Sequence, residues 1–261
     1  MSKDIFDLTG KVALVTGGAS GLGRASVDEL ASRGAKIAIF DLNAEAGAAA
    51  VEALGADNAA FFSVDVVSEE AVEKAMQEVE ARFGALHVLV NCAGIGPAKK
   101  ILNRENEPMP LGDFTKIIGI NLTGSFNVAR CAASLMAKNE LEGGERGVII
   151  HTASVAAYEG QVGQCAYSAS KGGIVGMTLP MARDLAALGI RVNTVAPGIM
   201  ATPLLMGMPE KVTNSLAATV LNPSRLGQPS EYGGLVVHMA ENGYINGETI
   251  RIDGGIRMQP R

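Results

Sequence analysis

The stretch VALVTGGASGLG, residues 12–23, places a short apolar run directly before a glycine-rich loop. The run is rich in valine, which predicts a buried β-strand. Gly17, Gly21 and Gly23 have the spacing GxxxGxG, and a helical stretch follows them. Glycine permits a tight turn and the close approach of a pyrophosphate, whose charge is stabilised at the amino end of a helix. The stretch therefore predicts the start of a dinucleotide-binding unit.

The rest of the chain repeats this alternation of short apolar runs and Ala-rich helical stretches. Strands are expected at Val12–Thr16, Lys36–Phe40, Ala59–Val64, Leu86–Val90, Gly147–Thr152, Ile190–Val195 and Thr249–Ile252, and helices at about 22–33, 43–54, 68–83, 113–138, 165–188 and 229–241. Such alternation predicts an α/β fold: one Rossmann-like, doubly wound parallel sheet of about seven strands with helices on both faces. We find no long polar linker or repeat, so residues 1–261 are predicted to form a single domain.

Two segments interrupt the alternation. Residues 96–112 (GPAKKILNRENEPMPLG) are polar and contain proline, which predicts a loop insertion. Residues 200–222 are rich in leucine and methionine and follow the sixth strand, which predicts a lid over the carboxyl edge of the sheet. The apolar residues of this lid are Leu204, Leu205, Met206, Met208, Leu216 and Leu221. They form a flexible apolar surface suited to an acyl chain, or they pack on the core.

The composition excludes several classes of function. The formal net charge of −5 argues against binding to nucleic acid or to anionic membranes. The three cysteines, Cys92, Cys131 and Cys165, contain no CxxC pair, and the three histidines are scattered, so no disulfide framework and no metal site is expected. Residues 1–10 lack the basic or apolar pattern of a targeting peptide, and no apolar run reaches membrane-spanning length. A cytoplasmic location is predicted.

Asp41 ends the second predicted strand, eighteen residues after Gly23. A carboxylate at this place accepts hydrogen bonds from the ribose hydroxyls of an adenosine and repels a 2′-phosphate, so the cofactor is predicted to be NAD rather than NADP. The alternative is an aspartate that only caps a turn or helix. Arg24 is interpreted as a solvent-facing helix residue because neither Ser20 nor Leu42 adds a second basic group.

Tyr167 and Lys171 lie four residues apart, and Ser154 lies thirteen residues before the tyrosine. In a helix this spacing puts the phenol and the ammonium on one face. A nearby positive charge favours the phenolate, so Lys171 is expected to lower the pKa of Tyr167 from its usual value of about 10. The tyrosine would then exchange a proton with an alcohol or a carbonyl. The alternative is an ordinary helix with a surface lysine and a half-buried tyrosine.

Together these motifs resemble the short-chain dehydrogenase/reductase family over residues 8–256. The matching motifs are TGGASGLG at 16–23, Asp41, Asp65-Val66, Asn91-Cys92-Ala93-Gly94, Asn121, Ser154, Tyr167-x-x-x-Lys171 and Pro197-Gly198. The family usually has Asn-Asn-Ala-Gly where this chain has NCAG, a departure that keeps the small turn.

The resemblance implies the roles of the site residues. Tyr167 is the general acid/base, Lys171 lowers its pKa and binds the nicotinamide ribose, Ser154 holds the substrate oxygen, and Asn121 supports a water that relays the proton. From the pattern alone, Asn121 would be an anomaly or kink inside a helix. The implied cofactor-binding residues are Gly17, Ser20, Gly21, Leu22, Gly23, Asp41, Asp65, Val66, Asn91, Cys92, Ala93, Gly94, Tyr167, Lys171, Pro197, Gly198, Met200 and Thr202.

Within the family, the chain resembles the type-2 3-hydroxyacyl-CoA dehydrogenases, also known as type-10 17β-hydroxysteroid dehydrogenases. The resemblance lies in the Ser154–Tyr167 region, the 96–112 insertion and the terminal GETIRIDGGIRMQP. It implies NAD-dependent interconversion of 3-hydroxyacyl-CoA and 3-oxoacyl-CoA. Alternatives are a hydroxysteroid or other apolar alcohol dehydrogenase, a 3-oxoacyl-carrier-protein reductase, which Asp41 opposes, and a non-enzymatic NAD-binding protein.

The resemblance also suggests a substrate site and an assembly. The substrate-binding residues are predicted to be Ser154, Gln164 and Tyr167, and Gln161 either lines the substrate mouth or lies in a solvated loop. Lys99, Lys100 and Arg104 either meet the phosphates of CoA or belong to a solvated charged loop. The helices at 113–138 and 165–188 carry more apolar residues than one buried face needs. Family members pair such helices, usually in tetramers, so the resemblance implies a homotetramer. The alternative is that both helices are simply buried within the monomer.

Overall fold

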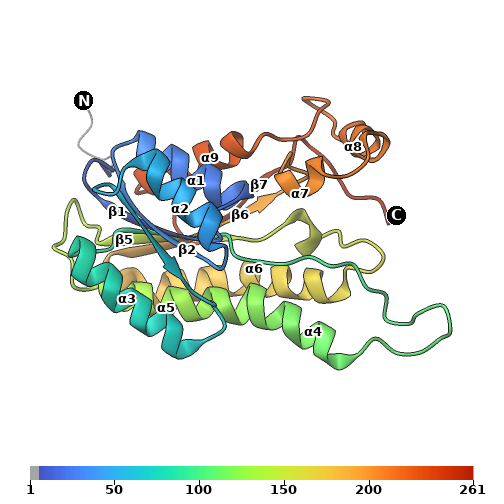
Figure 1. The fold of residues 1–261 in the computed structure, drawn as a ribbon, viewed down its shortest axis with the longest axis horizontal. Coiled ribbons are helices and arrows are strands. Elements are labelled where there is room, and N and C mark those ends of the chain that lie inside the picture. Colours follow the sequence, from blue (N-terminus) through green and yellow to red (C-terminus); the bar gives the residue numbers. More distant parts are fainter. Residues whose placement is uncertain (1–5, 261) are drawn as a thin grey trace.

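Seven parallel strands form the centre of the computed structural model, which describes residues 6–260 apart from the side chain of Leu204 (Figure 1). The strands are β1 (Val12–Thr16), β2 (Lys36–Asp41), β3 (Ala59–Ser63), β4 (Val88–Asn91), β5 (Gly147–Thr152), β6 (Ile190–Pro197) and β7 (Thr249–Ile252). Their order in the sheet is β3-β2-β1-β4-β5-β6-β7. The prediction of a doubly wound sheet is confirmed, and residues 1–5 and 261 of the predicted domain lie outside the described part.

Helices cover both faces of the sheet, because the strands present apolar residues on both sides. On one face lie α1 (Gly21–Ser32), α2 (Ala44–Leu54) and α9 (Pro229–Glu241), and on the other lie α3 (Glu69–Phe83), α4 (Leu111–Ile118), α5 (Gly124–Met136) and α6 (Cys165–Leu185) (Figure 1). Within β1, Ala13 and Val15 pack toward the first group, whereas Val12 and Leu14 pack toward the second. The two cores thus follow the two-residue period of a strand.

The strand order reverses between β1 and β4, and this point positions the site. Each strand of a doubly wound sheet is followed by a loop at its carboxyl end, and ligands bind where the order reverses. The loops that meet here follow Thr16 of β1, Asn91 of β4 and Thr152 of β5. A 3₁₀ turn, Val155–Ala157, follows β5 and leads toward α6.

The predicted helix 113–138 is three elements rather than one. Between α4 and α5 lies one π-helical turn, Gly119–Thr123, and α4 begins at Leu111, within the predicted insertion. A π-helical turn widens a helix locally and is frequent at functional sites. The remainder of segment 96–112 forms a loop with one antiparallel bridge between Leu102 and Pro108.

The predicted lid, residues 200–222, contains two short helices that the sequence pattern did not indicate. They are α7 (Pro203–Met206) and α8 (Glu210–Ala217). Proline at the first position of α7 has the fixed φ that a helix start requires. Leu205 turns inward to a cavity, whereas Met206, Met208 and Leu221 are exposed by 56%, 45% and 73%. The side chain of Leu204 lies outside the described part of the chain.

Candidate active site

A cavity of about 1190 Å³ lies at the carboxyl edge of the sheet and joins the glycine-rich loop to Ser154 and Tyr167. Nearly all of the predicted cofactor and substrate residues line it. They are Gly17, Ser20, Gly21, Leu22, Gly23, Asp41, Asp65, Val66, Cys92, Ala93, Gly94, Ser154, Gln164, Tyr167, Lys171, Pro197, Gly198, Met200 and Thr202. Asn91 and Asn121 do not line the cavity but are buried behind its wall.

The glycine-rich loop has the shape that its glycines predict. Gly17 has a φ of +63°, and a Cβ there would lie 2.9 Å from the backbone nitrogen of Ala93. A Cβ on Gly23 would lie 2.1 Å from the carbonyl oxygen of Gly17. Larger residues at either position would therefore displace the loop. The amino end of α1 opens on the cavity with no acidic side chain in its first turn, so this cradle fits a pyrophosphate.

Asp41 closes the cradle on the side of β2. One oxygen of its carboxylate accepts a hydrogen bond from the Ala19 backbone nitrogen (3.1 Å) and the other from that of Asn43 (3.0 Å). Both interpretations of Asp41 therefore apply, because it supports a turn and also lines the cavity. Arg24 forms an ion pair with Asp28 on the same helix at 2.8 Å, so its charge is directed along α1. Asp65 lines the cavity and accepts a hydrogen bond from the Val67 nitrogen (3.0 Å).

Helix α6 presents Tyr167 and Lys171 to the cavity, as their spacing predicts. The Lys171 ammonium lies 5.7 Å from the centre of the Tyr167 ring and donates a hydrogen bond to the Thr152 carbonyl (2.7 Å). Burial lowers the pKa of Lys171 to about 8. Burial also raises the pKa of Tyr167, and the interaction with the Ser154 hydroxyl opposes that rise.

The expectation that Lys171 lowers the pKa of Tyr167 is therefore wrong for this structure. The larger effect on the phenol is loss of water, and the ammonium is directed at the Thr152 carbonyl. At neutral pH this geometry favours a neutral phenol, which is a proton donor. Gly96 lies against the ring, since a Cβ there would be 3.3 Å from Tyr167 Cε2.

A family model described as short chain dehydrogenase matches residues 11–213 of the chain. The chain belongs to the short-chain dehydrogenase family. A protein named 3-hydroxyacyl-CoA dehydrogenase type-2 from Homo sapiens is 54% identical over 253 residues, which cover 96% of this chain and 97% of that protein. A protein of the same name from Rattus norvegicus is 52% identical, with all of both chains covered. The resemblance stated from the motifs is confirmed.

A solved structure supports the fold of this short-chain dehydrogenase. The crystal structure of 3-hydroxyacyl-CoA dehydrogenase type-2 from Mycobacterium avium superimposes with a TM-score of 0.92 at 42% identity, covering 98% of this chain and 100% of the other. None of the helices in the described residues is both long and apolar enough to cross a membrane. Residues 6–260 contain no group of three or more His, Cys, Asp or Glu side chains arranged to hold a metal ion.

Asn121 occupies the π-helical turn of this short-chain dehydrogenase and is fully buried. Its amide accepts a hydrogen bond from the Ile95 nitrogen (2.8 Å) and donates to the Ile95 carbonyl (2.9 Å) and the Ser170 hydroxyl (3.0 Å). A Cβ on Gly94 would lie 3.1 Å from Asn121 Oδ1 and 3.7 Å from Lys171 Nζ. Asn121, which the helix pattern alone does not explain, thus holds the loop after β4 in place beside Lys171.

Two residues that sequence reasoning missed, Thr152 and Tyr232, connect the site to α9. Tyr232 is fully buried, and its hydroxyl lies 2.7 Å from Thr152 Oγ1. Cys92 Sγ lies 3.4 Å from Thr152 Oγ1, and burial raises the pKa of its thiol, so Cys92 is a neutral packing group. Thr152 also supplies the carbonyl that binds Lys171. The only sequence signal was a tyrosine three residues before the apolar run 235–237 of the predicted helix.

His151 is a further buried polar residue that the motifs did not indicate. Its Nδ1 lies 3.2 Å from the Asn91 amide nitrogen, which also donates to the Ser125 carbonyl (3.1 Å). Because the Asn91 amide is the donor, the Nδ1 atom accepts and the neutral ring carries its proton on Nε2, which has no partner among the described residues. Burial lowers the pKa of His151 to about 3.

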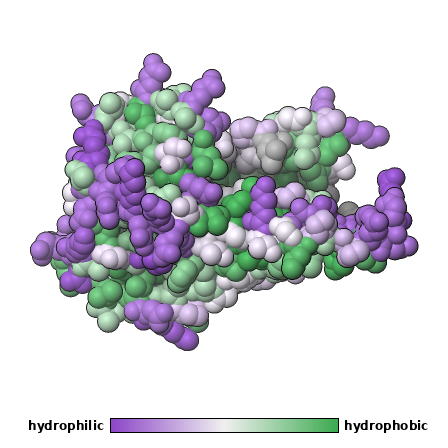
Figure 2. Space-filling view, turned by 60° about the horizontal axis from the view of Figure 1, so that its bottom comes forward, coloured by the Kyte–Doolittle hydropathy of each residue, from purple (hydrophilic) through white to green (hydrophobic). Residues whose placement is uncertain are grey.

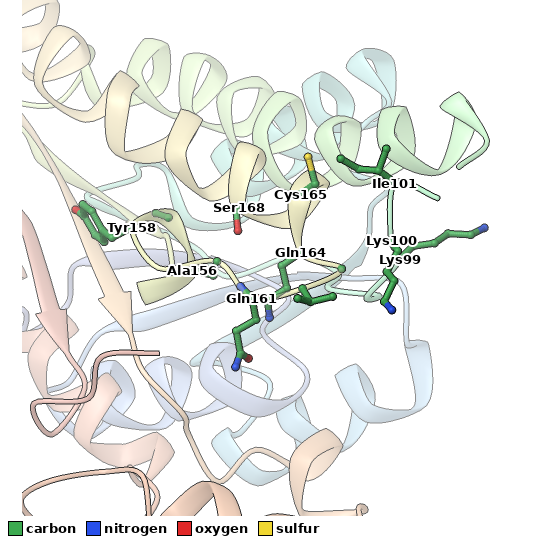
Figure 3. Close-up of a pocket in the computed structure, with 13 residues that line it drawn as sticks. Lys99, Lys100, Ile101, Ala156, Tyr158, Gln161, Gln164, Cys165 and Ser168 are labelled. Carbon is green, nitrogen blue, oxygen red and sulfur yellow. The ribbon is translucent and has the colours of Figure 1, made fainter. Parts of the chain in front are cut away.

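A second hollow of about 510 Å³ lies beside the main cavity (Figure 3). Lys99, Lys100, Gln161 and Gln164 line it, and Arg104 lines neither space. Lys99 forms an ion pair with Asp113, whereas Lys100 is exposed. Figure 3 shows the side chain of Lys100 extending away from the loop and Gln164 lying between the other labelled residues. The structure thus brings the predicted mouth residues and two of the three basic residues to one place.

Proposed function

We propose that this short-chain dehydrogenase interconverts 3-hydroxyacyl-CoA and 3-oxoacyl-CoA with NAD as its cofactor. One observation carries the proposal: a single cavity connects the glycine cradle and Asp41 to Ser154, Tyr167 and Lys171. The names of relatives at 52–54% identity support the substrate class. The residues that fit a nicotinamide dinucleotide are those of the cradle, which only glycine permits, together with Asp41.

The reaction needs a proton donor and a group that holds the substrate oxygen. A nicotinamide dinucleotide held by the glycine cradle and Asp41 would supply the hydride acceptor or donor. In the reductive direction, the Tyr167 phenol donates its proton to the ketone oxygen while the Ser154 hydroxyl holds that oxygen. The raised pKa of Tyr167 suits this direction at neutral pH, because the phenol then carries its proton. Lys171 orients the nicotinamide ribose, and Asn121 fixes the loop beside it and supports the path of the replacement proton.

The choice of NAD over NADP rests on Asp41. Its carboxylate lies at the cavity wall, with its two oxygens aimed by two backbone N–H groups. The 2′-phosphate of NADP would lie beside the negative carboxylate of Asp41. Two like charges about 4 Å apart repel strongly near a protein surface, where the effective dielectric constant is lower than in water. Arg24, the basic residue in the first turn of α1, is paired with Asp28 and so offers little compensation.

The CoA arm is assigned to the second hollow. This hollow and the main cavity share Ala156 and Gln164 in their walls, so a thioester that passes Gln164 reaches both. Lys100 is free to meet a phosphate, whereas Lys99 is engaged with Asp113 and contributes less than the sequence suggested. Arg104 lines neither space and is not included among the CoA contacts.

The decisive experiment is the oxidation of NADH, followed by its absorbance, with acetoacetyl-CoA and in parallel with a steroid ketone. We expect acetoacetyl-CoA to be reduced with the larger kcat/KM. A larger value for the steroid would support the hydroxysteroid alternative. No turnover with any acyl-CoA would refute the proposed substrate class, and no turnover with any ketone would favour a non-enzymatic NAD-binding protein.

We further propose a homotetramer in the cytoplasm. Phe126 on α5 and Leu179 on α6 are exposed by 49% and 44%, on helices whose opposite sides pack into the core. Figure 2 shows hydrophobic side chains among hydrophilic ones on the side of the molecule that carries α3, α4 and α5. A second copy would cover such residues. Light scattering at micromolar concentration tests this, and a monomeric mass would contradict it.

A further inference from the structure

The C-terminal segment, residues 256–260, lies against the loop 158–164 that leads into α6. Gln161 donates its side-chain amide to the Gln259 carbonyl (2.8 Å), and the Val162 nitrogen donates to the Pro260 carbonyl (3.1 Å). The Met258 nitrogen donates to Glu159 Oε2 (3.0 Å). Three hydrogen bonds in five residues therefore tie this segment to the loop.

A cluster of charges anchors the same contact. Arg251 at the end of β7 forms an ion pair with Glu159 at 2.8 Å and another with Asp253 at 2.7 Å. Arg257 joins both carboxylates, at 3.4 Å from Glu159 and 3.2 Å from Asp253. Ile256 is buried to 1% exposure between them. Pairs that form such a network hold geometry better than isolated surface pairs.

The anchored segment delivers one side chain to the catalytic cavity. Met258 lines the cavity together with Ser154, Gln164, Tyr167 and Leu205. The loop that it holds also separates that cavity from the second hollow, since Gln164 belongs to both walls and Gln161 to the hollow alone (Figure 3). A substrate with its reacting carbon beside Tyr167 could therefore extend in two directions, one past Gln164 and one toward the wall formed by Leu205 and Met258.

We propose that Met258 is a specificity-determining residue that limits the length of the acyl chain, with the C-terminal segment as its support. This inference rests on the proposed function, because it assigns the CoA arm to the exit past Gln164 and the acyl arm to the other. An unbranched thioether side chain suits this place, because it adapts to chains of different length while excluding water. Glu159 acts as a positioning residue through the Met258 backbone.

The test compares kcat/KM along a series of straight-chain 3-oxoacyl-CoA substrates, from four to twelve carbons, for wild type and Met258→Ala. Removing the wall should raise the ratio of the longest to the shortest substrate by about tenfold, the usual scale for space equal to one or two methylenes. Glu159→Gln, which loosens the support without touching the cavity, should shift the ratio in the same direction by less. The control is Gln259→Ala, because only its carbonyl takes part in the contact.

The outcomes separate this inference from the proposed function. The same variants are measured with straight-chain 2-ketones of increasing length, which lack CoA. If Met258→Ala raises the ratio of kcat/KM for long to short substrates in either series, with an unchanged midpoint of thermal unfolding, the role of Met258 as a cavity wall is supported. Profiles that coincide for wild type and Met258→Ala overturn it, even where acyl-CoA is a good substrate. If only the ketones are turned over, the acyl-CoA substrate class is refuted, but the ketone series still tests whether Met258 limits chain length. If the wild type turns over neither series, both proposals are refuted.

Discussion

The cofactor side and the substrate side of the cavity are built differently. Around β1 and β4 the wall is main chain: the Cys92 and Ala93 nitrogens both donate to Thr16 Oγ1 at 3.1 Å, and Ala19 is tied to Asp41. On the other side the wall consists of segments outside the sheet, namely residues 96–112, 156–164, 200–222 and 256–260. The sheet therefore positions the cofactor side, and we expect the added segments to determine substrate selectivity.

Exposure follows the same division. Most of the exposed large apolar residues lie in these added segments, among them Ile101, Val162 and Met206 with exposures of 63%, 48% and 56%, although Leu42 on the cofactor side is exposed by 68%. The strands under the cofactor are almost completely buried. Changes on the cofactor side should thus impair all substrates or stability, whereas changes on the substrate side should alter selectivity. The predictions below can confirm or contradict this difference.

The largest effect is expected at Tyr167, where the two sides meet. Tyr167→Phe keeps the ring but removes the proton donor, so kcat should fall by about a thousandfold for every substrate. NADH binding, followed by fluorescence, should persist. Tyr244→Phe is the control, because that side chain is fully exposed. Turnover close to that of the wild type at saturating substrate would remove Tyr167 from the mechanism.

His151 tests the buried core beneath the site. Its pKa in the fold is about 3, whereas the unfolded chain binds the proton near pH 6.5. Below that value the unfolded state gains a proton that the folded state does not, so this residue lowers stability as the pH falls and has no such effect above about pH 6.5.

Between about pH 7 and about pH 5, the free energy of unfolding of His151→Asn should therefore fall by about 2 kcal/mol less than that of the wild type. Denaturant unfolding at both pH values measures it. His238→Asn, at an exposed position on α9, is the matched control. Equal pH dependence of wild type and His151→Asn would contradict the assignment.

Asp41 tests selectivity on the cofactor side. Asp41→Ala should reduce the preference for NAD over NADP by about ten- to a hundredfold, or about 1.4 to 3 kcal/mol, because the like charge is removed. The ratio of kcat/KM values for the two cofactors measures this. Asp57→Ala, an exposed change away from the cavity, should leave the ratio alone. A wild type that uses both cofactors equally would already refute the role of Asp41.

The smallest effect is expected at Lys100. Lys100→Glu should raise KM for acetoacetyl-CoA by about threefold with kcat unchanged, the pattern of lost uniform binding at an exposed charge. The change should weaken at high salt and be absent for a ketone without CoA. Lys74→Glu on α3 controls for net charge. An unchanged KM for acetoacetyl-CoA would exclude contact with the CoA phosphates.

The sequence predicted the sheet and its edge well, because both depend on local patterns. All seven strands lie within two residues of their expected bounds, and the glycine loop, Asp41, Ser154, Tyr167 and Lys171 line one cavity. Parallel strands are buried on both faces, so their apolar runs are continuous and easily recognised. Glycine spacing and the Tyr–Lys spacing are equally local.

What the sequence did not predict depends on contacts between distant segments. The Thr152–Tyr232 contact and the approach of Met258 to the cavity join residues that no local pattern connects. The predicted direction of the Tyr167 pKa was wrong because burial, which raises the pKa, outweighs the hydrogen bond with Ser154, and burial is a property of the whole fold. The helices α7 and α8 span only four and eight residues, too short for an apolar period to be recognised, and the π-helical turn differs from an α-helix only in its hydrogen bonds.

The π-helical turn determines how far α4 is rotated about the helix axis relative to α5, although the two helices are continuous in the chain. Residues advance by about 100° in an α-helix, so the extra residue that such a turn accommodates rotates everything before it by about that angle. Thr115 and Lys116 of α4 thereby line the cavity, while Val128 and Ala132 of α5 remain in the core. Deleting one residue from Gly119–Thr123 would turn α4 as a whole without altering its composition. The π-helical turn that contains Asn121 therefore also allows one face of α4 to line the cavity while a different face of α5 packs on the sheet.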